Sequence, residues 1–125
     1  MRNYSTIDRI IKPQHQSLTN TQLQQAIDHI QDHLGGDLSL IRIAETINIS
    51  PNYFASLFKQ KTGISPHQYV IQQRVDRAIV LLQKTDLRSR EIAIQVGFSS
   101  QSHLTQHIKR ATGMTPKQIA KIRRS

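Results

Sequence analysis

One pattern of residues occurs twice in this chain. The segment from Ile43 to Pro66 reads IAETINISPNYFASLFKQKTGISP, and the segment from Ile92 to Pro116 reads IAIQVGFSSQSHLTQHIKRATGMTP. The copies stay in register except for one extra residue, Ser99, in the second turn. Each copy has the pattern of a helix, a tight turn and a second helix. We therefore expect two similar helical units that present two similar helices to their surroundings.

Start and stop signals place the helices. Asn20 is expected to cap the first helix, and Ser39 the second. Ser50-Pro51 combines a cap with proline at the first helical position, and Gly63 ends that third helix. The pattern predicts an all-α fold of about seven helices with no strand. Its expected divisions are 1–19, a flexible tail or linker; 20–66, the first helix-turn-helix subdomain; 67–84, a long linking helix; and 85–125, the second helix-turn-helix subdomain.

Charge and composition restrict the partners. The chain has 17 Lys and Arg against 8 Asp and Glu, a formal net charge of +9, so an anionic partner is expected. The absence of cysteine excludes thiol catalysis and thiolate metal sites. No apolar run approaches the roughly 20 residues of a membrane span. We expect a cytoplasmic protein without a membrane partner.

The second helix of each repeat is expected to have one apolar and one polar face. In the first repeat the inward residues are Phe54, Leu57 and Phe58, and in the second they are Leu104, Ile108 and Ala111. The outward residues of the first are Asn52, Ser56 and Lys59, flanked by Ala55 and Gln60. Those of the second are Ser102, Gln106 and Lys109, flanked by Gln101, His103, Thr105 and Arg110.

Neither outward face contains an acidic residue. An ordinary solvated helix usually carries a mixture of Glu and Lys, whereas short polar groups with cations suit base edges and phosphates. The phosphate contacts are assigned to Lys59, Gln60, Thr105, Lys109 and Arg110. Double-stranded DNA is therefore the expected partner, with the two helices in neighbouring major grooves.

Residues from about 20 to 122 resemble the AraC/XylS family of bacterial transcription regulators. The strings that carry the resemblance are LSLIRIAETINISPNYFASLFKQKTGISPHQYV, QQRVDRAIVLLQ and EIAIQVGFSSQSHLTQHIKRATGMTPKQI. The resemblance implies base contacts from Asn52, Ala55 and Ser56 in the first unit, and from Gln101, Ser102, His103 and Gln106 in the second. It also implies transcription regulation, with activation through contact with RNA polymerase.

The sequence departs from this family in five places. Gln106 stands where the family commonly has Arg, which favours adenine over guanine as its partner. Arg42 occupies a position where an acid would complete a capping box. Arg88-Ser89-Arg90 replaces the usual small cap and apolar residue, and Ile108 and Ile119 replace aromatic residues, which predicts a less bulky second core.

Other interpretations remain open or are weaker. Members of the family often carry an effector domain, so the chain is either a short effector-independent regulator or the C-terminal part of a longer one. The pairs His29/His33 and His103/His107 have metal-ligand spacing, but they lack a third ligand and a catalytic Glu. Neither a metal, a cofactor nor an enzymatic site is expected. The alternative function is a basic protein-interaction module that binds an acidic protein.

The duplication also predicts the form of the DNA site. Two units in one chain can bind as a monomer, and successive major grooves on one DNA face are about 34 Å, or roughly 10 base pairs, apart. Since the outward residues of the two units differ, the expected site consists of two unlike boxes about one helical turn apart.

Overall fold

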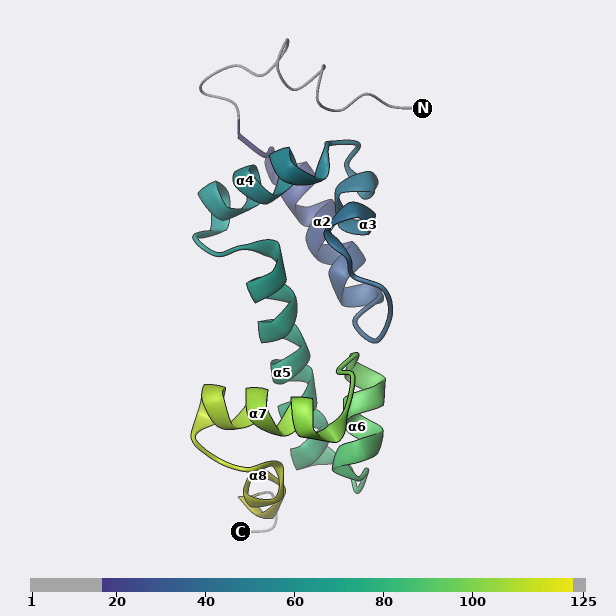
Figure 1. Ribbon diagram of the computed structural model, residues 1–125, viewed down its shortest axis with the longest axis vertical. Coiled ribbons are helices and arrows are strands. Elements are labelled where there is room, and N and C mark those ends of the chain that lie inside the picture. Colours follow the sequence, from purple (N-terminus) through teal and green to yellow (C-terminus); the bar gives the residue numbers. More distant parts are fainter. Residues whose placement is uncertain (1–16, 123–125) are drawn as a thin grey trace. The chain divides into compact units, whose positions relative to one another are not determined.

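The computed structural model describes residues 17–122, and this part of the chain forms seven α-helices and no strand (Figure 1). Their bounds are α2 (Asn20–Asp32), α3 (Leu40–Thr46), α4 (Pro51–Thr62), α5 (Pro66–Lys84), α6 (Ser89–Val96), α7 (Gln101–Thr112) and α8 (Pro116–Ile122). The predicted all-α fold is confirmed. Within these residues, no helix has both the length and the apolar composition that crossing a membrane requires.

The chain divides into two compact units. The first contains the described residues 17–33 and 37–69, and the second contains 34–36 and 70–122. Most of α5 belongs to the second unit, whose core includes Val75, Ala78 and Leu82.

Of the predicted tail over residues 1–19, residues 1–16 lie outside the described part. Leu18 is 1% exposed, so it belongs to the hydrophobic core. Thr19, and not Asn20, caps α2: its hydroxyl accepts the Gln22 N–H at 3.0 Å, and its own N–H donates to Gln22 Oε1 at 3.0 Å. This reciprocal capping box explains why the helix begins where it does.

The core of the first unit is built on aromatic side chains from α4. Phe54 and Phe58 are both fully buried, and their ring centroids are 5.6 Å apart. Tyr69, at the start of α5, meets the Phe58 ring edge to face at 5.6 Å. Ala26 and Ile30 of α2 and Ile43 and Ala44 of α3 are buried as well. The helical spacing of apolar residues thus predicted the buried face correctly.

The second unit repeats this plan with smaller side chains. Its core contains Ile92, Ala93 and Val96 of α6, Leu104 and Ile108 of α7, and Ile119 of α8. Ala111 was predicted to point inward, but it is exposed. The buried stripe of α7 ends at Ile108, and Ala111 lies in the last turn of the helix, next to the exposed Thr112 and Gly113.

A short loop after α2 is held by an arginine of α5. Arg74 donates from Nε to the Leu34 carbonyl at 3.0 Å and from Nη2 to the Gly36 carbonyl at 3.1 Å. Partial burial lowers the pKa of its guanidinium, which nevertheless stays charged at physiological pH. These bonds explain why residues 34–36 belong to the second unit.

Candidate nucleic-acid interface

The turns between the paired helices begin in the same way in both units. Asn48, after α3, has a φ of 60°, and its counterpart Gly97, after α6, has a φ of 96°. One residue later, Ile49 donates its N–H to the Ala44 carbonyl at 3.3 Å, and Phe98 donates to the Ala93 carbonyl at 2.9 Å. The repeated bond closes the first part of each turn, and the second turn then has one more residue, Ser99. Figure 1 shows the α3–α4 and α6–α7 pairs.

Caps at both ends define the two exposed helices. The hydroxyl of Ser50 accepts the N–H of Tyr53 at 3.4 Å, and Ser100 accepts that of His103 at 3.1 Å. At the other end Thr62 and Thr112 donate to carbonyls one turn earlier, those of Phe58 at 2.8 Å and Ile108 at 2.7 Å. The duplication therefore extends to details of capping that fix where each helix begins and ends.

Helix α4 presents its predicted outward residues to solvent. Asn52, Ser56, Lys59 and Gln60 are exposed, and Ala55 is half-buried. The opposite side of the helix is covered, because Tyr53 is buried together with Phe54, Leu57 and Phe58. Tyr53 was not predicted to be buried. Its place next to Phe54 widens the apolar face of the helix and narrows the outward stripe.

Helix α7 has a matching exposed face. Gln101, Ser102, Gln106, Lys109 and Arg110 are exposed, and Thr105 and His103 are half-buried. Leu104 and Ile108 hold the opposite side in the core. All residues of the second unit that were predicted to meet DNA, except His103 and Thr105, are thus exposed.

All charged side chains on α4 and α7 are positive. Neither α4 nor α7 contains Asp or Glu, and each carries two cations near its carboxyl end: Lys59 and Lys61 on α4, Lys109 and Arg110 on α7. Cations in the last turn complement the helix dipole, and they also suit an anionic polymer passing the same end.

His103 belongs to a small cluster of rings in the second unit. Its Nδ1 lies 3.1 Å from the Ser99 hydroxyl, and its Nε2 lies 3.2 Å from Nε2 of His107. Phe98 packs against both imidazoles, with centroid distances of 5.4 Å to His103 and 5.2 Å to His107. Ser99 is the extra residue of the second repeat, so this insertion supplies a partner for His103. A base contact by His103 would require a ring nitrogen to leave these partners.

The histidine pairs have no further metal ligands. No group of three or more His, Cys, Asp or Glu side chains among residues 17–122 is placed to hold a metal ion. His29 and His33 stack with a centroid distance of 4.2 Å, and Nδ1 of His33 lies 2.9 Å from the carbonyl oxygen of His29.

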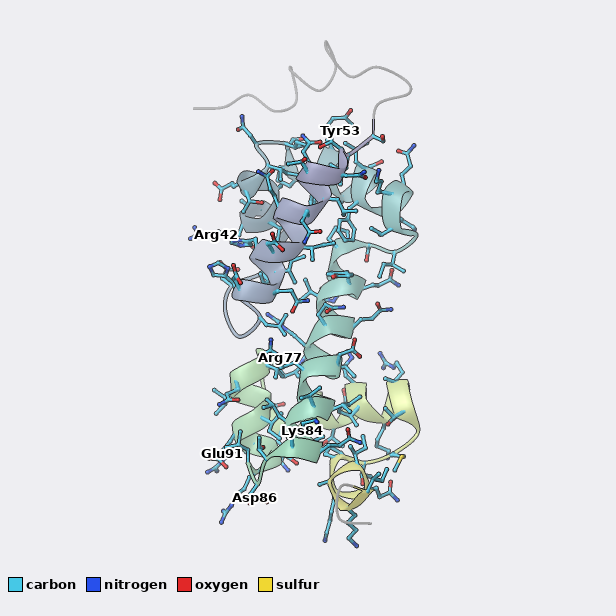
Figure 2. All side chains as sticks on the ribbon, turned by 180° about the vertical axis from the view of Figure 1, so that it is seen from behind. Arg42, Tyr53, Arg77, Lys84, Asp86 and Glu91 are labelled. Atoms are coloured by element: carbon cyan, nitrogen blue, oxygen red, sulfur yellow. The ribbon has the colours of Figure 1, made fainter. Side chains whose placement is uncertain are left out.

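The first helices of the two pairs begin differently. In α3 the Ser39 hydroxyl accepts the Arg42 N–H at 3.4 Å, while Asp37 accepts the Ser39 N–H at 3.0 Å and lies 3.5 Å from Arg42 Nε. The Ser39 backbone N–H is the main cause of the lowered pKa of Asp37, and Arg42 contributes less. The capping-box position of α3 holds Arg42 and not an acid. Asp37, which precedes the helix, thus places a carboxylate at its start instead. Figure 2 shows Arg42 on α3.

The N-cap residue of α6 is Arg88, whose side chain cannot accept a backbone N–H because a guanidinium has no acceptor atom. Only the reciprocal half of a capping box forms: the Arg88 N–H donates to Glu91 Oε1 at 2.9 Å. Glu91 is labelled on α6 in Figure 2.

Two helix pairs, each presenting a capped, acid-free second helix, define a helix-turn-helix protein of the DNA-binding class. A family model described as "Helix-turn-helix domain" matches residues 43–122. The chain belongs to the AraC-type family of helix-turn-helix transcription regulators, whose members are regulators and not enzymes.

Similar proteins agree with this assignment. An AraC-type transcriptional regulator from Chromobacterium violaceum has 29% identity and a TM-score of 0.78, covering 82% of this chain and 92% of that one. The DNA-binding domain of AdpA, solved in complex with a target DNA, has 29% identity and a TM-score of 0.77, covering 82% of this chain and 93% of that one. The probable transcriptional regulator LumQ of Photobacterium leiognathi is 35% identical over 71% of this chain. The match spans only 36% of LumQ.

Proposed function

We propose that this chain binds a specific double-stranded DNA site as a monomer, with α4 and α7 inserted into neighbouring major grooves. The observation that carries the proposal is the pair of exposed, acid-free faces on α4 and α7, built on the same capping and turn geometry. The complex of the similar AdpA domain with a target DNA supports the choice of partner. The site has two unlike boxes, because the exposed residues of the two helices differ.

Base reading is assigned to Asn52, Ala55 and Ser56 on α4, and to Gln101, Ser102, His103 and Gln106 on α7. Side-chain amides pair with adenine through two hydrogen bonds, so Gln106 favours an adenine in the second box. Phosphate contacts are assigned to Lys59, Gln60, Thr105, Lys109 and Arg110. The regulatory role is activation in a bacterial cytoplasm, through contact with RNA polymerase.

Selection of bound sequences from random duplexes, followed by affinity measurements on the best site, tests this proposal. Gln106→Ala should change the base preferred at one position and cost about 1 to 3 kcal/mol on the best site. Lys59→Ala should weaken all sequences equally and flatten the slope of log affinity against log salt by about 1. Lys84→Ala, an exposed lysine on α5, is the charge-matched control and should leave both quantities unchanged.

Two outcomes contradict the proposal. A salt slope near zero on duplex DNA would favour the basic protein-interaction module instead. An unchanged base preference in the Gln106→Ala protein would show that α7 does not read the second box through its exposed face.

A further inference from the structure

A polar hollow opens at the start of α6, in the second unit. It has a volume of about 630 Å³ and is lined by Arg88, Ser89, Arg90, Glu91 and Gln101. The lining therefore carries two guanidinium groups and one carboxylate. Gln101 is the first residue of α7, so the hollow is continuous with the helix that carries the proposed reading residues of this unit.

The two arginines lack carboxylate partners within residues 17–122. The only lining acid, Glu91, accepts the backbone N–H of Arg88 with its Oε1 at 2.9 Å. Both arginine side chains are exposed, and neither forms an ion pair with an acidic side chain in this part of the chain. A net positive charge is thus left at the hollow.

The first unit has no such pair at the equivalent positions. Arg88 corresponds to Ser39, which caps α3, and Arg90 corresponds to Ile41, which is 60% exposed. Arg42, the third residue of α3, is already held by Asp37 at 3.5 Å. The two repeats, alike in their turns and caps elsewhere, therefore differ in charge at this place.

Arg88 is also a poor choice for the stability of α6. Ser, Thr, Asp or Asn at the capping position would accept a backbone N–H, as Ser39 does in the first unit. The Arg88 side chain gives up the cap hydrogen bond and, in the described part of the chain, gains no stabilising contact in its place, which points to a role outside folding. Guanidinium groups bind phosphate through two parallel hydrogen bonds, which makes arginine well suited to a phosphate site.

We propose that this hollow binds a phosphate of the DNA backbone beside the second box, with Arg88 and Arg90 as donors. The inference rests on the proposed function, because it takes α7 as the helix that enters the groove. The second unit then makes the larger electrostatic contribution to DNA affinity. Arg88 and Arg90 position the protein and carry no base preference of their own.

Single substitutions test the assignment of the two arginines. Arg88→Gln and Arg90→Gln should each weaken binding to all duplexes and lower the salt slope by about 0.9 for each phosphate that is no longer neutralised. The selected sequence should stay the same. Arg77→Gln, an exposed arginine on α5 that does not line the hollow, removes the same charge and should keep the wild-type slope (Figure 2). Equal slopes for all three variants would overturn the inference.

Two further variants separate binding from folding. Arg88→Ser supplies the missing cap, so it should raise the thermal unfolding midpoint while it lowers DNA affinity. Glu91→Gln keeps an oxygen for the Arg88 N–H but removes the negative charge from the hollow, so it should strengthen DNA binding. An Arg88→Ser protein with a raised midpoint and unchanged affinity would overturn the inference.

Neutral methylphosphonate linkages, placed one at a time along the best site, locate the phosphate. One linkage beside the second box should lower the DNA affinity of the wild-type protein and leave the affinity of the double variant R88Q/R90Q unchanged. Equal losses of affinity for both proteins at every linkage would overturn the inference, while a wild-type protein that binds no specific duplex would instead overturn the proposed function.

Inorganic phosphate should not perturb the NMR signals of the Arg88 and Arg90 side chains at millimolar concentration. Saturable shifts would assign the hollow to a free phosphate ligand instead.

Discussion

Gly97 shows how one residue joins two distant parts of the second unit. Its φ of 96° is accessible to glycine and strained for other residues, and a Cβ at this position would collide with the Leu34 carbonyl oxygen and lie 2.7 Å from Arg74 Nε. The first unit manages the same turn with Asn48, which tolerates the left-handed region. In the second unit glycine is necessary, because the loop held by Arg74 leaves no room for a Cβ at this turn.

A matched pair of substitutions separates backbone strain from this collision. Gly113→Ala, at a φ of 75° with open space around it, should cost about 1 to 3 kcal/mol of unfolding free energy from strain alone. Gly97→Ala, at a φ of 96°, carries at least as much strain and must also displace a backbone carbonyl, so it should lose about 1 to 3 kcal/mol more. Denaturant unfolding of both variants measures the difference. Equal losses would mean that Leu34 does not pack against Gly97 in solution.

At the scale of single residues, the sequence predicted side-chain exposure well where helical periodicity determines it. Phe54, Phe58, Leu104 and Ile108 were expected inside and are fully buried. His103 was expected outside and is half-buried. Its environment depends on Phe98 and His107, and a periodicity argument based on apolar residues does not count imidazoles as packing groups.

At the scale of elements, the ends of the helices account for most of the similarity between the units. Ser65 and Gln68 form a capping box at the start of α5, with bonds of 3.0 and 3.1 Å, and Thr115 and Gln118 form one at α8, with bonds of 2.8 and 3.1 Å. These boxes begin just before Pro66 and Pro116, where the duplicated strings end. A search for a hydroxyl followed three residues later by Glu or Gln could have found them.

The start of α3 gives a prediction about pH. The Ser39 backbone N–H is the main cause of the lowered pKa of Asp37 and the Arg42 guanidinium a lesser one, so Arg42→Gln should leave most of the lowering in place. An NMR titration of the Asp37 carboxyl group measures both proteins. A return to the ordinary value of about 3.9 in Arg42→Gln would show that the ion pair dominates.

The sign of the effect on stability follows from the direction of that shift. Because folding lowers the pKa of Asp37, its carboxylate stabilises the first unit above the pKa of the unfolded chain. This contribution is lost as the pH falls from about 4 through the pKa of the folded state. Asp37→Asn should therefore flatten the acid side of the stability profile. It should also lower stability at neutral pH, mainly because the Ser39 N–H loses a charged acceptor and to a lesser degree because the ion pair with Arg42 is lost.

At the scale of the whole molecule, two features could not be predicted from local sequence. The assignment of residues 34–36 to the second unit depends on bonds from Arg74, which is 38 to 40 residues away in the chain. Most of α5 belongs to the second core because its apolar stripe packs with α6, α7 and α8. Both facts concern long-range contacts, whereas periodicity and capping report on neighbours along a helix.

The proposed mode of binding predicts a fixed spacing between the two boxes. Both units take residues from the continuous helix α5, so we expect their recognition helices to require boxes about 10 base pairs apart. Inserting about 5 base pairs between the boxes turns one of them to the opposite side of the duplex. Specific affinity should then fall to that of a single box, and inserting a full turn should not restore it.

Competition binding on a series of inserted sites, with the stoichiometry measured by ultracentrifugation, tests this. A palindromic site bound by two copies of the chain, or a site that tolerates the half-turn insertion, would contradict binding as a monomer with both helices engaged.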